Sequence, residues 1–102
     1  LKQLSVILLD VTLHHVQGIE VDGDHLYVTS VDRQTKKGWL HLIDLKSRKL
    51  LREVEVQEGQ RYHPGGISMD ADSLWIPVAE YRPLSSATVQ QREKKTLRLL
   101  SR

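Results

Sequence analysis

The sequence repeats itself at a spacing of 48 residues, and this periodicity restricts the possible folds more than any other feature. Residues 15–28 align with residues 63–76 with six identities and three matches between similar apolar or aromatic residues. The identical pairs are His15 and His63, Gly18 and Gly66, Ile19 and Ile67, Asp22 and Asp70, Asp24 and Asp72, and Leu26 and Leu74. Such a repeat indicates two structural units that bury their apolar faces against each other.

Each unit is predicted to contain four short β-strands. In the first unit, strand-forming residues occupy 18–21, 26–31, 38–45 and 50–56. In the second unit, the corresponding stretches are 66–69, 74–78, 86–90 and 97–100. The Asp22-Gly23-Asp24 sequence is typical of a tight hairpin turn. Residues 90–95 are good helix formers and leave a helix as the alternative there, but the repeat favours a strand.

Four antiparallel strands in a unit of this length are typical of one blade of a β-propeller. The sequence therefore predicts an all-β fold of two four-stranded antiparallel blades, residues 15–62 and residues 63–102. We interpret residues 1–14 as the end of a preceding blade, with an outer strand at 5–10 and an inward crossing at 12–14. Two blades cannot close a ring, so we expect this chain to be a fragment of a larger propeller. The further blades would come from missing sequence or, if the chain is complete, from a homo-oligomer.

Composition excludes several classes of protein. The net charge of +2 comes from interspersed lysines, arginines and acids, which argues against nucleic acid as a partner. The most basic stretch, residues 92–102, is interpreted as a solvated tail or as a strand, a turn and a strand. The absence of cysteine excludes disulfides and thiolate metal sites. The apolar stretch 6–9 is too short for a membrane span.

Three stretches resemble a family of uncharacterised bacterial β-propeller proteins that are predicted to be secreted or periplasmic. They are residues 14–33 (HHVQGIEVDGDHLYVTSVDR), residues 63–67 (HPGGI) and residues 75–83 (WIPVAEYRP). The resemblance runs over most of the chain and implies a propeller fold and export from the cytoplasm. A looser similarity links the chain to six-bladed propellers of the gluconolactonase and regucalcin type, which hold a divalent metal ion on the central axis.

The predicted hairpin turn fixes a strand register. Counting outward from Gly23 and Asp24 places His15 opposite Asp32, and the same arithmetic in the second unit places His63 opposite Glu80. Each unit would then present a histidine and a carboxylate at the same mouth of the central channel. A register slip of one residue would abolish both pairs.

Seven residues at this mouth are candidates for binding a small molecule or a protein: His15, Asp32, Arg33, His63, Glu80, Tyr81 and Arg82. Imidazole and carboxylate groups suit a divalent metal ion, which His15, His63, Asp32 and Glu80 would hold, and they suit acid–base catalysis near neutral pH. The same pairs would serve equally well as structural hydrogen bonds that tie each loop to its strand.

Two functions stay open on this basis. The favoured one is a binding or scaffold module of the cell envelope, and the alternative is a metal-dependent hydrolase or lactonase of the six-bladed type. His14, His25 and His41 are interpreted as surface residues or as satisfied core residues. Ser30, Ser85 and Ser86 lack the sequence context of a nucleophile elbow, so serine hydrolase chemistry is not predicted.

Overall fold

A computed structural model describes residues 8–9 and 11–101 of the chain. Within these ranges every regular element is a β-strand, and no helix occurs that could span a membrane. The first unit contains β1 (His15–Asp22), β2 (His25–Asp32), β3 (Lys37–Asp44) and β4 (Leu50–Glu55). The second contains β5 (Arg61–Pro64), β6 (Ser68–Met69), β7 (Ser73–Glu80), β8 (Ala87–Glu93) and β9 (Leu99–Ser101).

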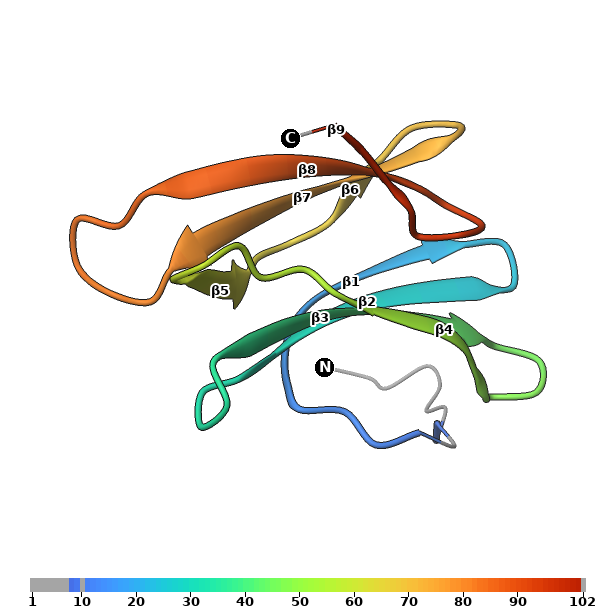
Figure 1. Cartoon of the computed structure of the whole chain (residues 1–102). Coiled ribbons are helices and arrows are strands. Elements are labelled where there is room, and N and C mark those ends of the chain that lie inside the picture. The colour runs from blue at the N-terminus through green and yellow to red at the C-terminus, as the bar shows by residue number, and fades with distance from the viewer. Residues whose placement is uncertain (1–7, 10, 102) are drawn as a thin grey trace, which may run out of the picture.

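The strands form two antiparallel sheets that lie one above the other (Figure 1). The first sheet has the order β1-β2-β3-β4, and the second has the order β5-β7-β8-β9 with β6 also paired to β7. This confirms the predicted all-β fold of two antiparallel four-stranded units, an arrangement that fits propeller blades. Residues 90–95, for which a helix was the alternative, form the end of β8 and the turn after it.

Two predicted strands differ from the structure. The stretch 66–69 is strand only at Ser68–Met69, because Pro64, Gly65 and Gly66 are poor strand residues and divide the inner strand into β5 and β6. The outer strand predicted at 5–10 lies mostly outside the described residues, and its described members Leu8 and Leu9 are not in a strand.

The segment before β1 runs across the side of the first sheet that faces away from the second sheet (Figure 1). There it covers a small apolar cluster formed by Leu26, Val28 and Ile43. The residues packed on that cluster are Leu9, Val11, Leu13 and Leu45. The segment therefore shields only part of this side, because Ile19 and Val21 of β1 stay exposed beside it.

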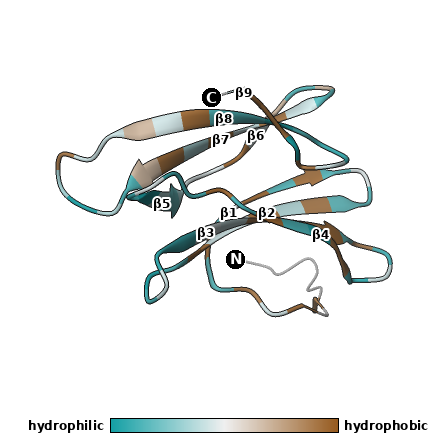
Figure 2. Cartoon of the chain, in the orientation of Figure 1, coloured by the Kyte–Doolittle hydropathy of each residue, from teal (hydrophilic) through white to brown (hydrophobic). Residues whose placement is uncertain are grey.

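The main core lies between the two sheets. Successive side chains of a strand point to opposite faces, so Tyr27 of β2 faces the second sheet while Leu26 and Val28 face away. From the other side, Leu74 and Ile76 of β7 face the first sheet. The buried cluster comprises Tyr27, Leu40, Leu42, Val56, Ile67, Leu74, Ile76, Val78 and Leu97. Figure 2 shows the corresponding hydrophobic stretches on strands of both sheets.

The inner strands of the two units approach closely at glycine. A Cβ atom at Gly18 would lie 2.8 Å from the Cα atom of Gly66 and 3.1 Å from the backbone oxygen of Gly65. Neither neighbour is a flexible side chain that can move aside. The spacing of the sheets here therefore depends on a residue without a side chain.

Replacing Gly18 by alanine should lower the free energy of unfolding by about 1–2 kcal/mol, because the added methyl group forces the two backbones apart. Urea unfolding monitored by circular dichroism measures this loss. Gly66→Ala is the matched control, since a Cβ atom at Gly66 meets no atom within 4 Å. Equal losses in the two variants would contradict the close approach as the cause.

Candidate functional site

The structure corrects the register predicted for the outer ends of both hairpins. The pairs nearest the turn are confirmed, with Val21 opposite Leu26, but His15 lies opposite Val31 instead of Asp32. In the second unit His63 lies opposite Ala79 instead of Glu80. The cause is an irregularity between Val16 and Gly18, and a break at the corresponding place in the second unit, each of which shifts the pairing by one residue.

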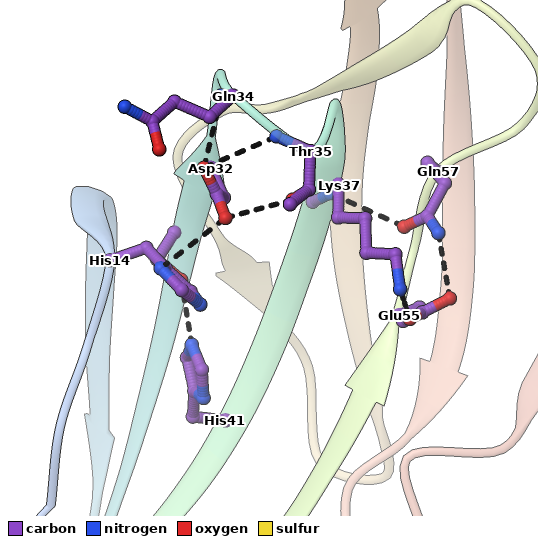
Figure 3. Close-up of polar contacts among 10 residues, drawn as sticks. His14, Asp32, Gln34, Thr35, Lys37, His41, Glu55 and Gln57 are labelled. Atoms are coloured by element: carbon purple, nitrogen blue, oxygen red, sulfur yellow. Dashed lines mark hydrogen bonds and ion pairs between the residues drawn. The ribbon is translucent and has the colours of Figure 1, made fainter.

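The carboxylate of Asp32 holds the turn between β2 and β3. It accepts hydrogen bonds from the backbone N–H of Gln34 at 3.0 Å and from the hydroxyl of Thr35 at 2.8 Å (Figure 3). The hydroxyl of Thr35 is the main reason why the pKa of Asp32 lies below its ordinary value. The nearest histidine is His14, whose Nδ1 lies 3.9 Å from the carboxylate. Asp32 is thus a turn residue.

Glu80 has the corresponding role in the second unit. Its carboxylate accepts hydrogen bonds from the backbone N–H and the hydroxyl of Ser86, at the far end of the loop between β7 and β8. The same carboxylate forms an ion pair with Arg82, with the guanidinium Nε 2.8 Å from the carboxylate oxygen. The bonds from Ser86 and the charge of Arg82 lower the pKa of Glu80. Its negative charge is therefore already compensated.

The structure brings other predicted site residues together across the two sheets. The guanidinium carbon of Arg33 lies 4.5 Å from the ring centroid of Tyr81, a cation–π contact between the two units. The imidazole of His63 stacks on the same ring, with 5.1 Å between centroids. Arg33 and Tyr81 occupy equivalent positions of the two repeats. We call Arg33, His63, Tyr81 and Arg82 the rim cluster.

A pocket opens at the rim cluster. Its volume is about 480 Å³, and its lining residues are His63, Glu80, Tyr81, Arg82 and Pro83. A second hollow of about 270 Å³ shares Glu80, Tyr81 and Arg82 and adds Lys36, Gln60 and Tyr62. The first volume lies within the range typical of small-molecule sites.

The imidazole of His63 is the titratable group of this pocket. Its burial is the main cause that lowers its pKa below the ordinary value of 6.5, and the neighbouring charge of Arg33 lowers it further. His63 is therefore neutral at pH 7 in the unliganded protein. Because the charge of Arg33 contributes to this lowering, an anion bound beside His63 would offset that contribution and favour the protonated form.

A comparison with protein families shows that the model of one family, described as a family of unknown function (DUF6454), matches residues 1–101. The chain belongs to the DUF6454 family. A comparison with curated proteins finds no match for this DUF6454 protein.

The four residues proposed as metal ligands do not converge in the DUF6454 protein. Among the described residues, no group of three or more histidine, aspartate or glutamate side chains lies close enough to hold a metal ion. Asp32 and Glu80 are directed at their own loops, and His15 and His63 lie opposite aliphatic residues. The geometry thus gathers the aromatic and cationic members of the predicted site but not its histidine–carboxylate pairs.

Sequence reasoning missed a hydrogen-bonded chain across β2, β3 and β4. Nε2 of His41 lies 2.7 Å from the hydroxyl of Ser30, and Nδ1 lies 2.7 Å from the carboxylate of Glu53. A carboxylate can only accept, so Nδ1 carries the proton and Nε2 accepts from the hydroxyl. The order of groups is that of a serine hydrolase triad, but Ser30 and His41 are both buried beyond the reach of a substrate.

The position of His41 had been interpreted as surface or satisfied core, and the structure confirms the second. Burial is the main cause that lowers the pKa of His41, against the opposing effect of Glu53. In the second sheet the equivalent position is Gln90, because Gln90 pairs with Ile76 as His41 pairs with Val28. Both units therefore place a polar side chain at the same buried point of their third strand.

Proposed function

We propose that this DUF6454 protein is a binding module that holds a small anionic molecule at the rim cluster. In this interpretation the two sheets are neighbouring blades of a propeller, and the rim cluster lies at the mouth of its central channel. The resemblance to secreted and periplasmic propellers suggests the cell envelope as the place of binding. The observation that carries the proposal is a pocket lined by Arg82 and Tyr81, where the guanidinium group of Arg33 lies over the ring of Tyr81.

The charges around the pocket favour an anion. Arg82 lines the pocket, Arg33 of the first unit lies over the ring of Tyr81, and Lys36 lines the adjoining hollow. The carboxylate that shares the pocket, Glu80, pairs with Arg82 and accepts hydrogen bonds from Ser86, so the net positive charge beside the pocket comes from Arg33 and Lys36. Arginine is the side chain best suited to carboxylate, sulfate or phosphate groups, because its N–H donors match their oxygens in pairs.

The aromatic groups favour a ligand with a flat or apolar part. Tyr81 is about half exposed, and its ring is accompanied by His63 on one side and by Tyr62 at 6.4 Å between centroids. A rigid aromatic surface of this kind provides contact area at a low cost in side-chain entropy. A planar carboxylate would therefore use both the ring and the guanidinium groups.

Titration of the protein with benzoate and with sulfate, followed by NMR, tests the proposal. Both anions should shift the signals of Tyr81 and His63, and benzoate should bind more tightly because it also stacks. Arg33→Gln should weaken binding about tenfold, the usual effect of removing one charge-assisted hydrogen bond. Lys49→Gln is the matched control, because it removes an equal charge from the exposed turn between β3 and β4. If both variants bound the anions equally less tightly, the effect of Arg33→Gln would be one of net charge alone. If neither anion shifted the NMR signals of Tyr81 and His63, the site would be refuted.

Sulfate binding should strengthen as the pH falls below 6.5. The free protein disfavours the protonated imidazole of His63 because of burial and the cations beside it. A bound anion offsets these cations, so binding and protonation favour each other. Sulfate keeps its charge over this range, so the change reports on the protein. Calorimetry at several pH values measures it, and His63→Gln should bind sulfate with a flat pH profile.

A further inference from the structure

One turn of the first unit carries two cationic residues to the rim cluster. The turn between β2 and β3 contains Arg33 and Lys36, and it lies at the same end of the sheets as the loop between β7 and β8 (Figure 1). The guanidinium group of Arg33 lies over the ring of Tyr81, and Lys36 lines the second hollow, which Tyr81 also lines. Within the described part of the chain, neither cation forms an ion pair. The turn therefore offers two positive charges to a ligand.

The backbone of this turn is fixed without a ligand. The carboxylate of Asp32 accepts hydrogen bonds from the backbone N–H of Gln34 and from the hydroxyl of Thr35 (Figure 3). Lys36 has a positive φ of 58°, a left-handed conformation that a lysine adopts only where the surrounding structure imposes it. The backbone positions of both cations are thus set in advance, which lowers the entropic cost of binding two negative charges.

The pocket at the rim cluster and the second hollow have a common wall but differ in the rest of their lining. Both are lined by Glu80, Tyr81 and Arg82, whereas His63 and Pro83 belong to the pocket alone and Lys36, Gln60 and Tyr62 belong to the second hollow alone. The ammonium and amide groups of the second hollow are hydrogen-bond donors that suit a carboxylate. Because the wall is shared, a ligand that fills the pocket can extend past Tyr81 into the second hollow.

We propose that the ligand of the rim cluster is a flat dicarboxylate with its two carboxylate groups at opposite ends, an inference that rests on the proposed function. The ring and one carboxylate lie in the pocket, where Arg33 is the cation without a partner charge. The second carboxylate lies in the second hollow and accepts hydrogen bonds from Lys36 and Gln60. Glu80 and Arg82 already neutralise each other, so two negative charges on the ligand match the two cations of the turn.

Calorimetric titration with terephthalate, phthalate and benzoate tests this inference. At about pH 7.5 the carboxyl groups of all three are ionised and His63 is neutral. Terephthalate should bind about tenfold more tightly than benzoate, because its second carboxylate gains a charge-assisted hydrogen bond. Phthalate has the same charge as terephthalate, but its adjacent carboxylates cannot reach both spaces, so it should bind about as benzoate does. Equal affinities for phthalate and terephthalate would overturn the inference, because the gain would then come from charge alone.

Two variants assign the gain to the second hollow. Lys36→Gln keeps an unbranched side chain and should bind terephthalate about tenfold less tightly, while its affinity for benzoate stays unchanged and shows that the variant is folded. Lys49→Gln removes an equal charge from the turn between β3 and β4 and should leave the ratio of the two affinities as it is in the unchanged chain. An unchanged chain that binds terephthalate no more tightly than benzoate would contradict the dicarboxylate and leave the proposed function standing. If neither compound bound, the proposed function would fail, and this inference with it.

Discussion

Replacing Tyr27 by alanine is expected to lower the free energy of unfolding by about 3–5 kcal/mol, the range measured for large aromatic side chains removed from a core. The ring lies in the cluster between the sheets, and its hydroxyl donates a hydrogen bond to the backbone oxygen of Lys94 at 3.1 Å. The substitution therefore removes apolar contacts and leaves that carbonyl without this donor. Chemical unfolding at a concentration where the chain is monomeric measures the loss.

The repeat supplies the matched control for this experiment. Trp75→Ala removes a larger ring from the equivalent position of the second sheet, where no third sheet covers it among the described residues. The indole group also donates a hydrogen bond to Asp70 at 3.1 Å, so the substitution still costs some stability. Because Trp75 is partly exposed, the expected loss is less than half of that for Tyr27. If the two variants lost the same stability, the two sheets would not be packed against each other as described.

The second large effect concerns the buried histidine of the first sheet. His41→Ala should lower the free energy of unfolding by about 3 kcal/mol, because it opens a cavity and leaves the buried hydroxyl of Ser30 without a partner. His41→Gln should cost much less. The second unit uses glutamine at this position, where Gln90 donates to the backbone oxygen of Val56 at 2.8 Å and to Glu58 at 2.6 Å.

The same histidine should make the fold sensitive to mild acid. The pKa of His41 is lowered in the folded protein, so the unfolded chain binds a proton at a higher pH than the folded chain does. The stabilisation from the neutral imidazole is complete above the ordinary value of 6.5, and it is lost as the pH falls from there toward the lowered pKa. Unfolding measurements from about pH 7.5 to about pH 5 should show a steeper decline for the unchanged chain than for His41→Gln. Parallel curves would contradict a buried neutral His41, since His63 and the carboxylates are common to both proteins.

The fold was predictable because its information is local and is present twice. Gly23 adopts the positive φ of 60° that a tight hairpin turn requires, and Asp22 and Asp24 beside it leave little doubt about where the strand reverses. The second copy of this turn, around Asp70 and Asp72, then fixes the boundaries of the unit. The continuous apolar runs of β2 and β7 predict the strands themselves but not their faces, since β2 is buried on both faces and β7 mainly on one.

The site was only partly predictable because it depends on backbone irregularity and on contacts between sheets. In residues 15–18 only Gly18 hints at the point where the pairing slips by one residue, because a glycine in a strand can mark either a bulge or a close backbone approach, and that slip separates His15 from Asp32. Of the seven residues predicted at the rim, the structure gathers Arg33, His63, Tyr81 and Arg82, yet the contact of Arg33 with Tyr81 joins two units and cannot be counted along one hairpin. The hydrogen-bonded chain of Ser30, His41 and Glu53 could not be predicted by counting along one hairpin either, because its members come from three strands of one sheet.

The slip in register also carries information about the history of the chain. It falls at the same place in both units, beside Val16 in one and beside Pro64 in the other, where two differing residues stand between the identical pairs His15/His63 and Gly18/Gly66. Two independent events would have to coincide to produce this, whereas a single ancestral hairpin with the same irregularity accounts for both copies. The shared irregularity is therefore a feature that a duplicated hairpin would retain even where Val16 and Gln17 of one copy correspond to Pro64 and Gly65 of the other.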